Sequence, residues 1–274
     1  MVETNMNVTL LAHTQLSEAF VDKTYIVEGI DRHTLQPKYI GGVEYTTDGQ
    51  AVALSAIRTC YSPGKPSEIV VKEGAKYFGA QATDGKEGTE ADRLFRQIVA
   101  SKHTSTLEHI SFTFAIEGVS RALLAQLTRH RVGFSYSVQS QRYVKFGSDN
   151  RSGGFDYIKP DSVTADKKVP SNDDGDYYVH LNALDIFEDA MNDAQYAYDR
   201  LRKAGVPAED ARAVLPNAAA TNLVMTTNLR SLLDLYAKRR EGRGAQGEIC
   251  SLAEELRKQV VAVEPWVDQF FEGA

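Results

Sequence analysis

Cysteine is scarce in this sequence: Cys60 and Cys250 are the only two among 274 residues. They lie far apart, and neither belongs to a Cys-x-x-Cys or Cys/His spacing, so the sequence indicates neither a zinc site nor a disulfide framework. We therefore expect no metal centre. Two reduced thiols are the simplest interpretation, and they are typical of a cytoplasmic protein.

Long apolar runs are absent as well. No stretch approaches the roughly 20 consecutive apolar residues that a helix needs to cross a bilayer. The first residues show no basic segment followed by an apolar run, as a secretory signal would require. There is also no internal repeat and no linker long enough to separate domains. We therefore expect one domain, spanning 1–274, without a membrane partner.

Basic charge is not in excess, because the formal net charge is -6. A general nucleic-acid binder usually carries a net basic face that displaces counterions, so we expect no nucleic-acid partner. With 42% hydrophobic and 25% charged residues, the composition is that of a soluble globular protein. Any cluster of cations in this chain must therefore be local.

One such cluster runs from Arg129 to Tyr143 and reads Arg-His-Arg-Val-Gly-Phe-Ser-Tyr-Ser-Val-Gln-Ser-Gln-Arg-Tyr. Guanidinium groups present a rigid fork of donors that matches two phosphate or carboxylate oxygens at once. The cluster therefore predicts an anion-binding site, with phosphate as the obvious ligand.

A purely structural interpretation of the first half of this cluster is also available. Ser120 is a candidate N-cap, and helical spacing after it places Arg129 and His130 in the last turn, where cations favour the carbonyl end of a helix. Gly133 then suits the left-handed residue that follows a helix. A solvated, basic helix end would not call for the second polar group at 140–142, which favours binding.

A second polar cluster stands where a helix gives way to a strand. Thr89 is a candidate N-cap for a helix that runs to about residue 101, and alternating apolar residues at 110–116 predict a strand. Between them, His103 and His109 are six residues apart, which is not the i, i+4 spacing of a helical zinc pair. Loop histidines beside a capping Glu108 are the simple alternative.

The pattern as a whole predicts an α+β fold, a compact single domain in which a mostly antiparallel sheet is flanked by long amphipathic helices. We expect a strand at 7–12, helices at 51–57, 184–201, 228–239 and 249–263, a short helix opened by Pro207, and a loop at 63–88. Residues 21–50 predict a peripheral, hairpin-like insertion and residues 147–178 a mobile surface loop. Arg230 and Asp234 stand at i, i+4 and could pair.

Several separated segments together resemble the flavin-dependent thymidylate synthase family. They are Arg58-Thr59-Cys60-Tyr61, His103 to His109, Arg129-His130-Arg131 leading to Ser140-Gln141-Arg142-Tyr143, Ala211-Arg212 with Leu215-Pro216, and Asn228-x-Arg230-Ser231 with Arg239. Each segment alone is a weak signal. Their order and spacing over residues 51–250 are specific.

The resemblance implies a reductive methylation of dUMP to dTMP. Methylenetetrahydrofolate would supply the carbon, NADPH the reducing equivalents, and a bound FAD would relay the hydride. The resemblance also implies a homotetramer whose active sites are built from more than one subunit. Because the flavin carries the redox step, the task of the protein would be binding, orientation and electrostatics.

The resemblance further assigns roles to residues, with Arg239 and His103 as catalytic residues. The residues implied to contact FAD are Cys60, His103, Ser105, Glu108, Arg129, His130, Arg131, Asn228, Arg230 and Asp234. The residues implied to contact dUMP are Gln126, Ser140, Gln141, Arg142, Arg212 and Arg239. Arginines can neutralise phosphates, and amides with a guanidinium near the uracil can hydrogen-bond its carbonyls.

The sequence departs from the family pattern in three places. The motif is usually written Arg-His-Arg-x7-Ser, whereas eight residues separate Arg131 from Ser140, and the extra residue fits best at 132–133. Asp234 stands where an asparagine is expected, and its carboxylate would repel a reduced flavin unless Arg230 neutralised it. Residues 21–50 are longer than the usual connection.

No nucleophile is predicted. Neither cysteine stands in the Pro-Cys-His context of the unrelated thymidylate synthase fold, and no His-Asp pair is evident to activate Ser140. Two alternatives stay open: a nucleotide- or RNA-binding module that uses the arginines, and a flavoprotein of the same fold that acts on another pyrimidine nucleotide. The net charge and the lack of repeated aromatic and basic interleaving disfavour the first.

Overall fold

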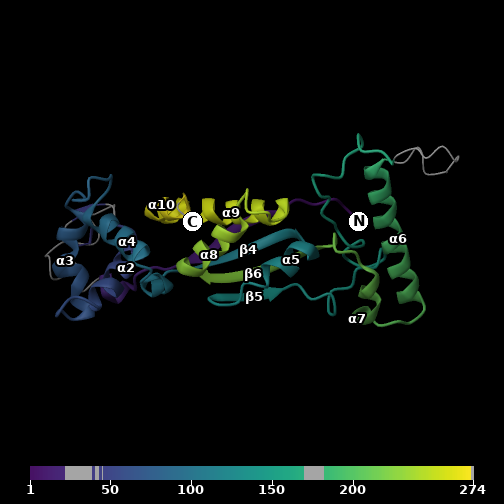
Figure 1. Ribbon diagram of the computed structural model, residues 1–274. Coiled ribbons are helices and arrows are strands. Elements are labelled where there is room, and N and C mark those ends of the chain that lie inside the picture. The colour runs from purple at the N-terminus through teal and green to yellow at the C-terminus, as the bar shows by residue number, and fades with distance from the viewer. Residues whose placement is uncertain (22–38, 41–42, 45, 170–181, 273–274) are drawn as a thin grey trace.

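A four-stranded antiparallel sheet lies at the centre of the computed structural model (Figure 1), which describes residues 1–21, 39–40, 43–44, 46–169 and 182–272. The strand order is β1-β4-β6-β5, with β1 at Asn7–His13, β4 at Ser111–Ser120, β5 at Phe134–Val138 and β6 at Ala220–Asn228. Two short strands, β2 (Tyr39–Ile40) and β3 (Val43–Glu44), pair separately.

Helices lie along the sheet and beyond both of its ends (Figure 1). Beyond one end are α2 (Asp48–Thr59), α3 (Ile69–Phe78) and α4 (Glu90–Ala100), and beyond the other are α6 (Ala183–Lys203) and α7 (Ala208–Ala211). Along the sheet lie α5 (Arg121–Leu127), α8 (Leu229–Arg239) and α9 (Gly247–Val263), and α10 (Asp268–Glu272) follows α9. Short 3-10 helices are η1 (Pro66–Glu68), η2 (Thr104–His109), η4 (Arg212–Val214) and η5 (Pro265–Val267).

The sheet has one buried face because apolar residues alternate along its central strands. Phe112, Phe114 and Ile116 of β4 are fully buried, and Met225 of β6 continues the same face. These side chains pack in one core with leucines of α5, α8 and α9. Full burial of such a side chain contributes about 1.5–3 kcal/mol, so this core holds the helices on the sheet.

A smaller apolar cluster holds the segment after β5 against α6. Phe155 is 1% exposed, and its backbone N–H donates to Gln195 at 3.0 Å. The backbone N–H of Phe146 donates to the buried Tyr198 hydroxyl at 3.2 Å. Residues 147–169 consist of turns, bends and isolated bridges. The remaining part of the predicted loop, 170–178, lies outside the described residues.

The predicted α+β class, with an antiparallel sheet flanked by amphipathic helices, is confirmed. The Thr89 cap is also present, because Thr89 Oγ1 accepts from the Asp92 N–H at 3.3 Å and Asp92 returns the bond. The predicted insertion at 21–50 lies mostly outside the described residues, which show only β2, β3 and the start of α2 there.

Two sequence-based expectations are wrong. Residues 63–88 are not one loop, because they contain α3, whose buried Ile69, Val70, Tyr77 and Phe78 form one helical face. Arg129 and His130 are not in the last turn of α5, because that helix ends at Leu127 and the chain turns toward β5. In both cases tertiary packing sets the boundary, which local propensity does not.

Candidate functional site

The first group of predicted residues lies where η2 meets the start of α8. His103 and Ser105 stand at the beginning of η2, and Glu108 near its end forms an ion pair with Arg230 of α8. Both side chains of this pair are about half exposed, at 44% and 51%. Because solvent screens such a pair, a ligand could compete for either partner at small cost.

Asn228 fixes the start of α8. Its Oδ1 accepts from the Ser231 N–H at 2.9 Å, as an N-cap does, and its own N–H donates to the Gly133 carbonyl at 3.4 Å. The turn that follows Arg131 therefore lies directly against the N-terminus of α8. Backbone N–H groups at a helix N-terminus favour anions, so this junction suits a phosphate or a flavin carbonyl.

Asp234 pairs with Lys238, whose Nζ lies 2.7 Å from Oδ2. The i, i+4 pair that Arg230 and Asp234 could have formed is not present, because Arg230 pairs with Glu108 instead. The aspartate that replaces the expected asparagine is thus neutralised, but by Lys238. A negative ligand beside α8 meets a balanced pair of charges at this position.

The segment at 58–61 is brought to η2. The Tyr61 hydroxyl lies 3.0 Å from His103 Nδ1, and the two rings meet edge to face at 6.1 Å. Cys60 Sγ contacts the Ala56 carbonyl at 3.7 Å and lies at the exposed end of α2. Tyr61 was not among the predicted site residues. Its neighbour Cys60 was, so the resemblance had located the segment but not this contact.

A cavity of about 670 Å³ opens beside this group. Val99, Leu233 and Phe270 give it apolar walls, and Lys86 and Arg230 place cations at it. Apolar walls combined with a few fixed charges are what planar, anionic ligands need, because rings can be buried while phosphates are paired.

The second group joins the end of α5 to the end of α8. Arg239 Nε donates to His130 Nε2 at 3.1 Å, and Arg239 Nη2 donates to the Gln126 carbonyl at 3.3 Å. The Gln126 amide, which interrupts the apolar stripe of α5, donates to Gln246 Oε1 at 2.6 Å and so has a side-chain partner. Gln246 was missed by the sequence analysis, since only the tertiary contact reveals it.

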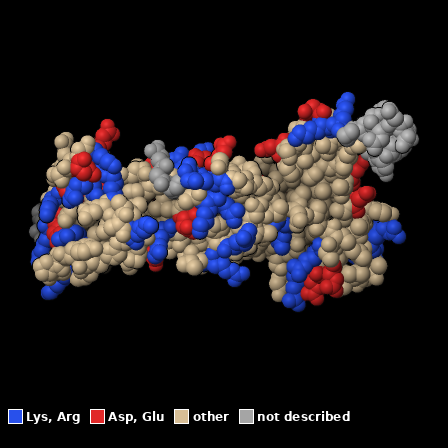
Figure 2. All heavy atoms as spheres, in the orientation of Figure 1, with Lys and Arg blue, Asp and Glu red and all other residues tan. Residues whose placement is uncertain are grey.

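Arg129 and Arg131 flank His130 with exposed side chains. Within the described part of the chain, no carboxylate pairs with either guanidinium. Figure 2 shows Lys and Arg side chains gathered over the middle of the visible face, although the net charge of the chain is -6. Basic charge is thus concentrated locally.

The third group lies at the α7 end of the sheet. Ser140 Oγ accepts from the Arg142 N–H at 3.2 Å, while Gln141 is buried. Arg142 Nε lies 2.5 Å from the Glu209 carboxylate, and Arg212 Nε donates to the Glu209 carbonyl at 2.9 Å. One residue of α7 therefore holds two guanidiniums close to each other.

Arg121 joins this third group and was missed by the sequence analysis. Burial and then the nearby Arg212 charge lower the pKa of Arg121. No carboxylate pairs with Arg121 among the residues that the structure describes. Guanidiniums that approach each other without full neutralisation form an anion site. Its place directly after the Ser120 cap, at the start of a helix, was the available sequence signal.

The three groups are not in one place. Strand β6 has 9 residues, so its ends at Ala220 and Asn228 are about 27 Å apart, and the α7 group lies toward the Ala220 end. Gln126 of α5 and Arg239 of α8 lie between these ends, and His130 contacts Arg239 from the turn between α5 and β5. The structure thus brings the predicted residues together as three neighbouring groups along the sheet.

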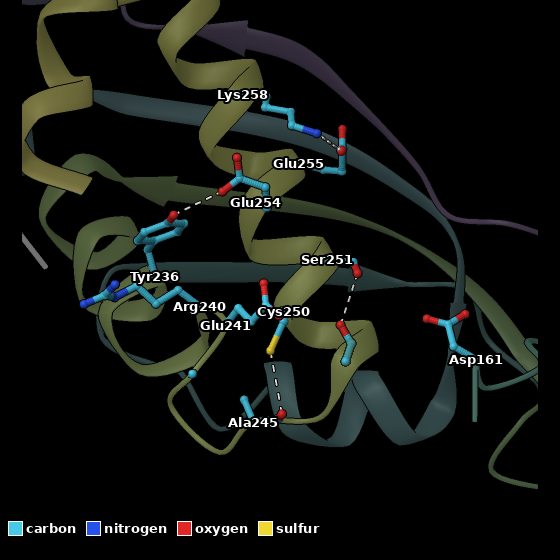
Figure 3. A pocket seen from close by; sticks show the side chains of 12 residues that line it. Asp161, Tyr236, Arg240, Glu241, Ala245, Cys250, Ser251, Glu254, Glu255 and Lys258 are labelled. Carbon is cyan, nitrogen blue, oxygen red and sulfur yellow. Dashed lines mark hydrogen bonds and ion pairs between the residues drawn. The ribbon is translucent and has the colours of Figure 1, made fainter. Parts of the chain in front are cut away.

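Another cavity, of about 730 Å³, lies between the end of α8 and α9 and is shown in Figure 3. Its lining pairs with itself, because Tyr236 donates to Glu254 and Lys258 pairs with Glu255. Burial, followed by the Glu241 charge, raises the pKa of Cys250, which disfavours the thiolate form. None of the predicted site residues lines this cavity.

Arginine side chains thus lie at three places along a single sheet, at the start of α8, at its end and beside α7. Among the described residues, no group of three or more His, Cys, Asp or Glu side chains is placed to hold a metal ion. No described helix is long and apolar enough to span a bilayer.

Comparison with known proteins identifies the class of this protein. Residues 43–266 match the family described as thymidylate synthase complementing protein. A flavin-dependent thymidylate synthase of Geobacter sulfurreducens is 39% identical over 225 residues, which cover 82% of this chain and 83% of that protein. One from Clostridium tetani is 36% identical over 239 residues, covering 81% and 82%. The chain belongs to this family and is an enzyme of the flavin-dependent thymidylate synthase class.

A solved structure supports the fold. The UMP/dUMP methylase PolB from Streptomyces cacaoi, bound with 5-Br dUMP, superposes with a TM-score of 0.62 at 20% identity. The match covers 99% of this chain and 96% of that chain. The sheet and its helices are therefore arranged as in that methylase.

Proposed function

We propose that this enzyme converts dUMP to dTMP by reductive methylation, with methylenetetrahydrofolate as the carbon donor, NADPH as the reductant and FAD as the bound cofactor. The observation that carries this proposal is the placement of three groups that contain arginines along one sheet in a chain of this family. The η2 and α8 junction with Arg129 and Arg131 can take a dinucleotide cofactor, and the α7 end with Arg239 can take a mononucleotide substrate.

FAD fits the groups at η2 and at the start of α8. The cavity of about 670 Å³ offers apolar walls for a ring system, and the N-terminus of α8 offers donors for an anion. Arg129 and Arg131 are exposed and free of described carboxylates, so they can pair with the pyrophosphate. The residues that would hold FAD are Cys60, His103, Ser105, Glu108, Arg129, His130, Arg131, Asn228, Arg230 and Asp234. FAD would supply the hydride chemistry.

The phosphate of dUMP fits the α7 end, where Arg142 and Arg212 both contact Glu209 and the Arg212 charge acts on Arg121. From Arg121 to Gln126 is five residues of α5, or about 7.5 Å along the helix axis. A mononucleotide held by its phosphate at the α7 end can therefore extend toward Gln126 and Arg239. Ser140 and Gln141 complete the phosphate end.

Arg239 is the residue proposed to act on the pyrimidine. A guanidinium that is already oriented can stabilise the negative charge that develops on a uracil carbonyl as the ring reacts at C5. His103 would contact the flavin, and the Tyr61 hydroxyl at its Nδ1 would hold the imidazole in its orientation. No protein nucleophile is required by this assignment. The Ser140 hydroxyl is hydrogen-bonded to a backbone amide, and no His-Asp pair activates it in the described residues.

A second candidate substrate is UMP. The methylase of similar fold is described as acting on UMP and dUMP, and the two nucleotides differ only at the 2′ position. Parallel assays with dUMP and UMP at equal concentration separate the two. The RNA-binding alternative is disfavoured by membership of the family.

Three further features are proposed by resemblance. The chain would act as a homotetramer with active sites shared between subunits, it would work in the cytoplasm, and residues 1–274 would form one domain with an insertion at 21–50 and a mobile loop at 147–178. Analytical ultracentrifugation at micromolar concentration tests the first of these.

A flavin titration tests the proposed cofactor. Purified protein mixed with FAD and passed through a desalting column should retain flavin absorption at about one flavin per chain. FMN at the same concentration should be retained less, because it lacks the second phosphate and the adenine. A folded protein that stays colourless after this treatment would contradict the proposal.

A further inference from the structure

The Arg239 guanidinium is held at two points by segments that are distant in the sequence. Its Nε donates to His130 Nε2 at 3.1 Å, and its Nη2 donates to the Gln126 carbonyl at 3.3 Å. Among the described residues, Nη1 has no recorded hydrogen bond. The two contacts therefore fix the plane of the guanidinium and leave its Nη1 edge available to a ligand.

This contact defines the protonation state of His130. A guanidinium can only donate, so His130 Nε2 must carry a lone pair, and the proton of a neutral imidazole must sit on Nδ1. A doubly protonated imidazole has no acceptor. Protonation of His130 would therefore replace the hydrogen bond to Arg239 with repulsion between two cations.

The surroundings of His130 favour the neutral ring. Burial, followed by the charges of Arg239 and Lys238, lowers the pKa of His130, and Arg129 acts in the same direction. Asp234 is the opposing charge, and it is already paired with Lys238. The net effect of the groups that face the ring is to keep His130 unprotonated near neutral pH.

The segment that carries His130 is also held by β5. The single proton of the Tyr136 hydroxyl is shared between the backbone carbonyl oxygens of His130, at 2.8 Å, and Leu127, at 3.0 Å. Burial raises the pKa of Tyr136, so its phenol stays a donor. The Phe134 ring lies 5.9 Å from the imidazole. These contacts connect the sheet through His130 to the last turn of α8.

We propose that His130 is the positioning residue for Arg239: its neutral imidazole holds the guanidinium in the orientation that serves the pyrimidine, and loss or protonation of the imidazole releases it. This role is separate from any contact of His130 with FAD. It rests on the proposed function only in assigning the pyrimidine to Arg239.

Two variants of His130 separate the effect of its hydrogen-bond acceptor from the effect of its side-chain volume. In His130→Gln, the side-chain oxygen can reach the place of Nε2 and does not titrate, whereas His130→Phe keeps a ring and has no acceptor. At saturating FAD, His130→Phe should lower kcat by tenfold or more, and His130→Gln should recover at least threefold of that loss. The acid limb of the pH profile of kcat should vanish in both variants.

A kinetic result can overturn the proposal. If His130→Phe regains wild-type kcat once FAD is saturating, His130 serves only flavin affinity. If the Phe and Gln variants lose kcat equally, the acceptor is irrelevant. Either outcome contradicts the proposed positioning of Arg239.

A second measurement does not depend on turnover. In protein labelled with ¹⁵N-arginine, the Nε–H of Arg239, assigned by its loss in Arg239→Lys, should exchange slowly with solvent. The same signal should exchange at least tenfold faster in His130→Phe and stay protected in His130→Gln. Fast exchange in the wild type would refute the inference. If the protein showed this protection but formed no dTMP, the proposed function would fail while the positioning contact stood.

Discussion

Gly133 lies against the start of α8 so closely that a Cβ on it would meet Ser231 Oγ at 2.0 Å and Asn228 Nδ2 at 2.7 Å. Its φ of 75° is in the left-handed region that favours glycine. The neighbouring Val132 is 89% exposed. The turn at 131–134 thus contains positions 132 and 133, where the extra residue of the motif fits. The same turn packs against the N-terminus of α8.

Gly133→Ala should therefore weaken FAD binding by tenfold or more, because the new methyl group displaces Ser231 or Asn228 and strains the backbone. Gly205→Ala is the matched control, since Gly205 has a φ of 88° but no atom lies within 4 Å of the place that a Cβ would occupy. In both variants an alanine in the left-handed backbone region should lower stability by about 1–2 kcal/mol. Flavin titration of both variants is the measurement, and equal loss of affinity would show that the contact with α8 is unimportant.

Arg142→Ala should weaken dUMP binding by tenfold or more. A charge-assisted hydrogen bond contributes about 1.5–3 kcal/mol, and about 1.4 kcal/mol corresponds to tenfold in affinity. Isothermal titration with dUMP gives the affinity directly. Glu209→Gln is the control, because it removes the carboxylate that pairs with Arg142 and should leave dUMP affinity the same or tighter. Unchanged affinity in Arg142→Ala would refute the assignment of the phosphate to the α7 end.

Replacement of both cysteines by serine should leave kcat within about twofold of the wild type. Each thiol hydrogen-bonds to a backbone carbonyl of its own helix or the preceding turn, Cys60 to that of Ala56 and Cys250 to that of Ala245. Neither is proposed as a nucleophile. The measurement is turnover of the double variant with saturating substrates, after circular dichroism has shown that it is folded. Abolished turnover in a folded double variant would disprove the proposed chemistry.

Glu264 should make the free energy of unfolding depend on pH. It is 1% exposed and accepts from the Trp266 indole at 2.6 Å, from the Gly49 N–H at 3.1 Å and from Thr47. Burial raises the pKa of Glu264 above its ordinary value of 4.5. The folded state therefore binds this proton more tightly than the unfolded chain. Its contribution to stability is complete below pH 4.5 and declines as pH rises through the raised pKa.

Urea denaturation of the wild type and of Glu264→Gln over a pH series tests this sign. The difference in unfolding free energy between them should shrink as pH rises, since the glutamine does not titrate. Glu255→Gln, in an exposed pair with Lys258, is the control and should show no such trend. In Glu264→Leu, each buried donor left without an acceptor should cost about 1–3 kcal/mol. A pH-independent difference for Glu264→Gln would contradict the account.

Local signals in the sequence predicted the elements that have local causes. The capping box at Thr89 and Asp92, the Ser120 cap and the alternation along β4 depend on residues a few positions apart, and all three are present. Helix α3 was missed because its Ile-Val-Val start is β-branched and Gly74 interrupts it, so only its buried face identifies it.

The composition of the site was predictable, whereas its pairings were not. The resemblance supplied Arg230, Glu108 and Asp234, but local spacing favoured the wrong partner for Arg230. The observed pair joins residues 122 apart in the sequence, and no local rule reaches that far. Gln246 and Tyr61 were missed for the same reason, because each acquires its place in the site through a tertiary contact.

The most direct test of the proposed function follows the carbon and the hydrogen at C5 of the pyrimidine. The protein is incubated with dUMP carrying tritium at C5, together with FAD, NADPH and methylenetetrahydrofolate, and both released tritium and dTMP are measured. We predict dTMP formation that requires NADPH and methylenetetrahydrofolate and that falls at least tenfold in Arg239→Ala. A folded, flavin-loaded protein that forms no dTMP, or that forms it without the folate, would contradict the account.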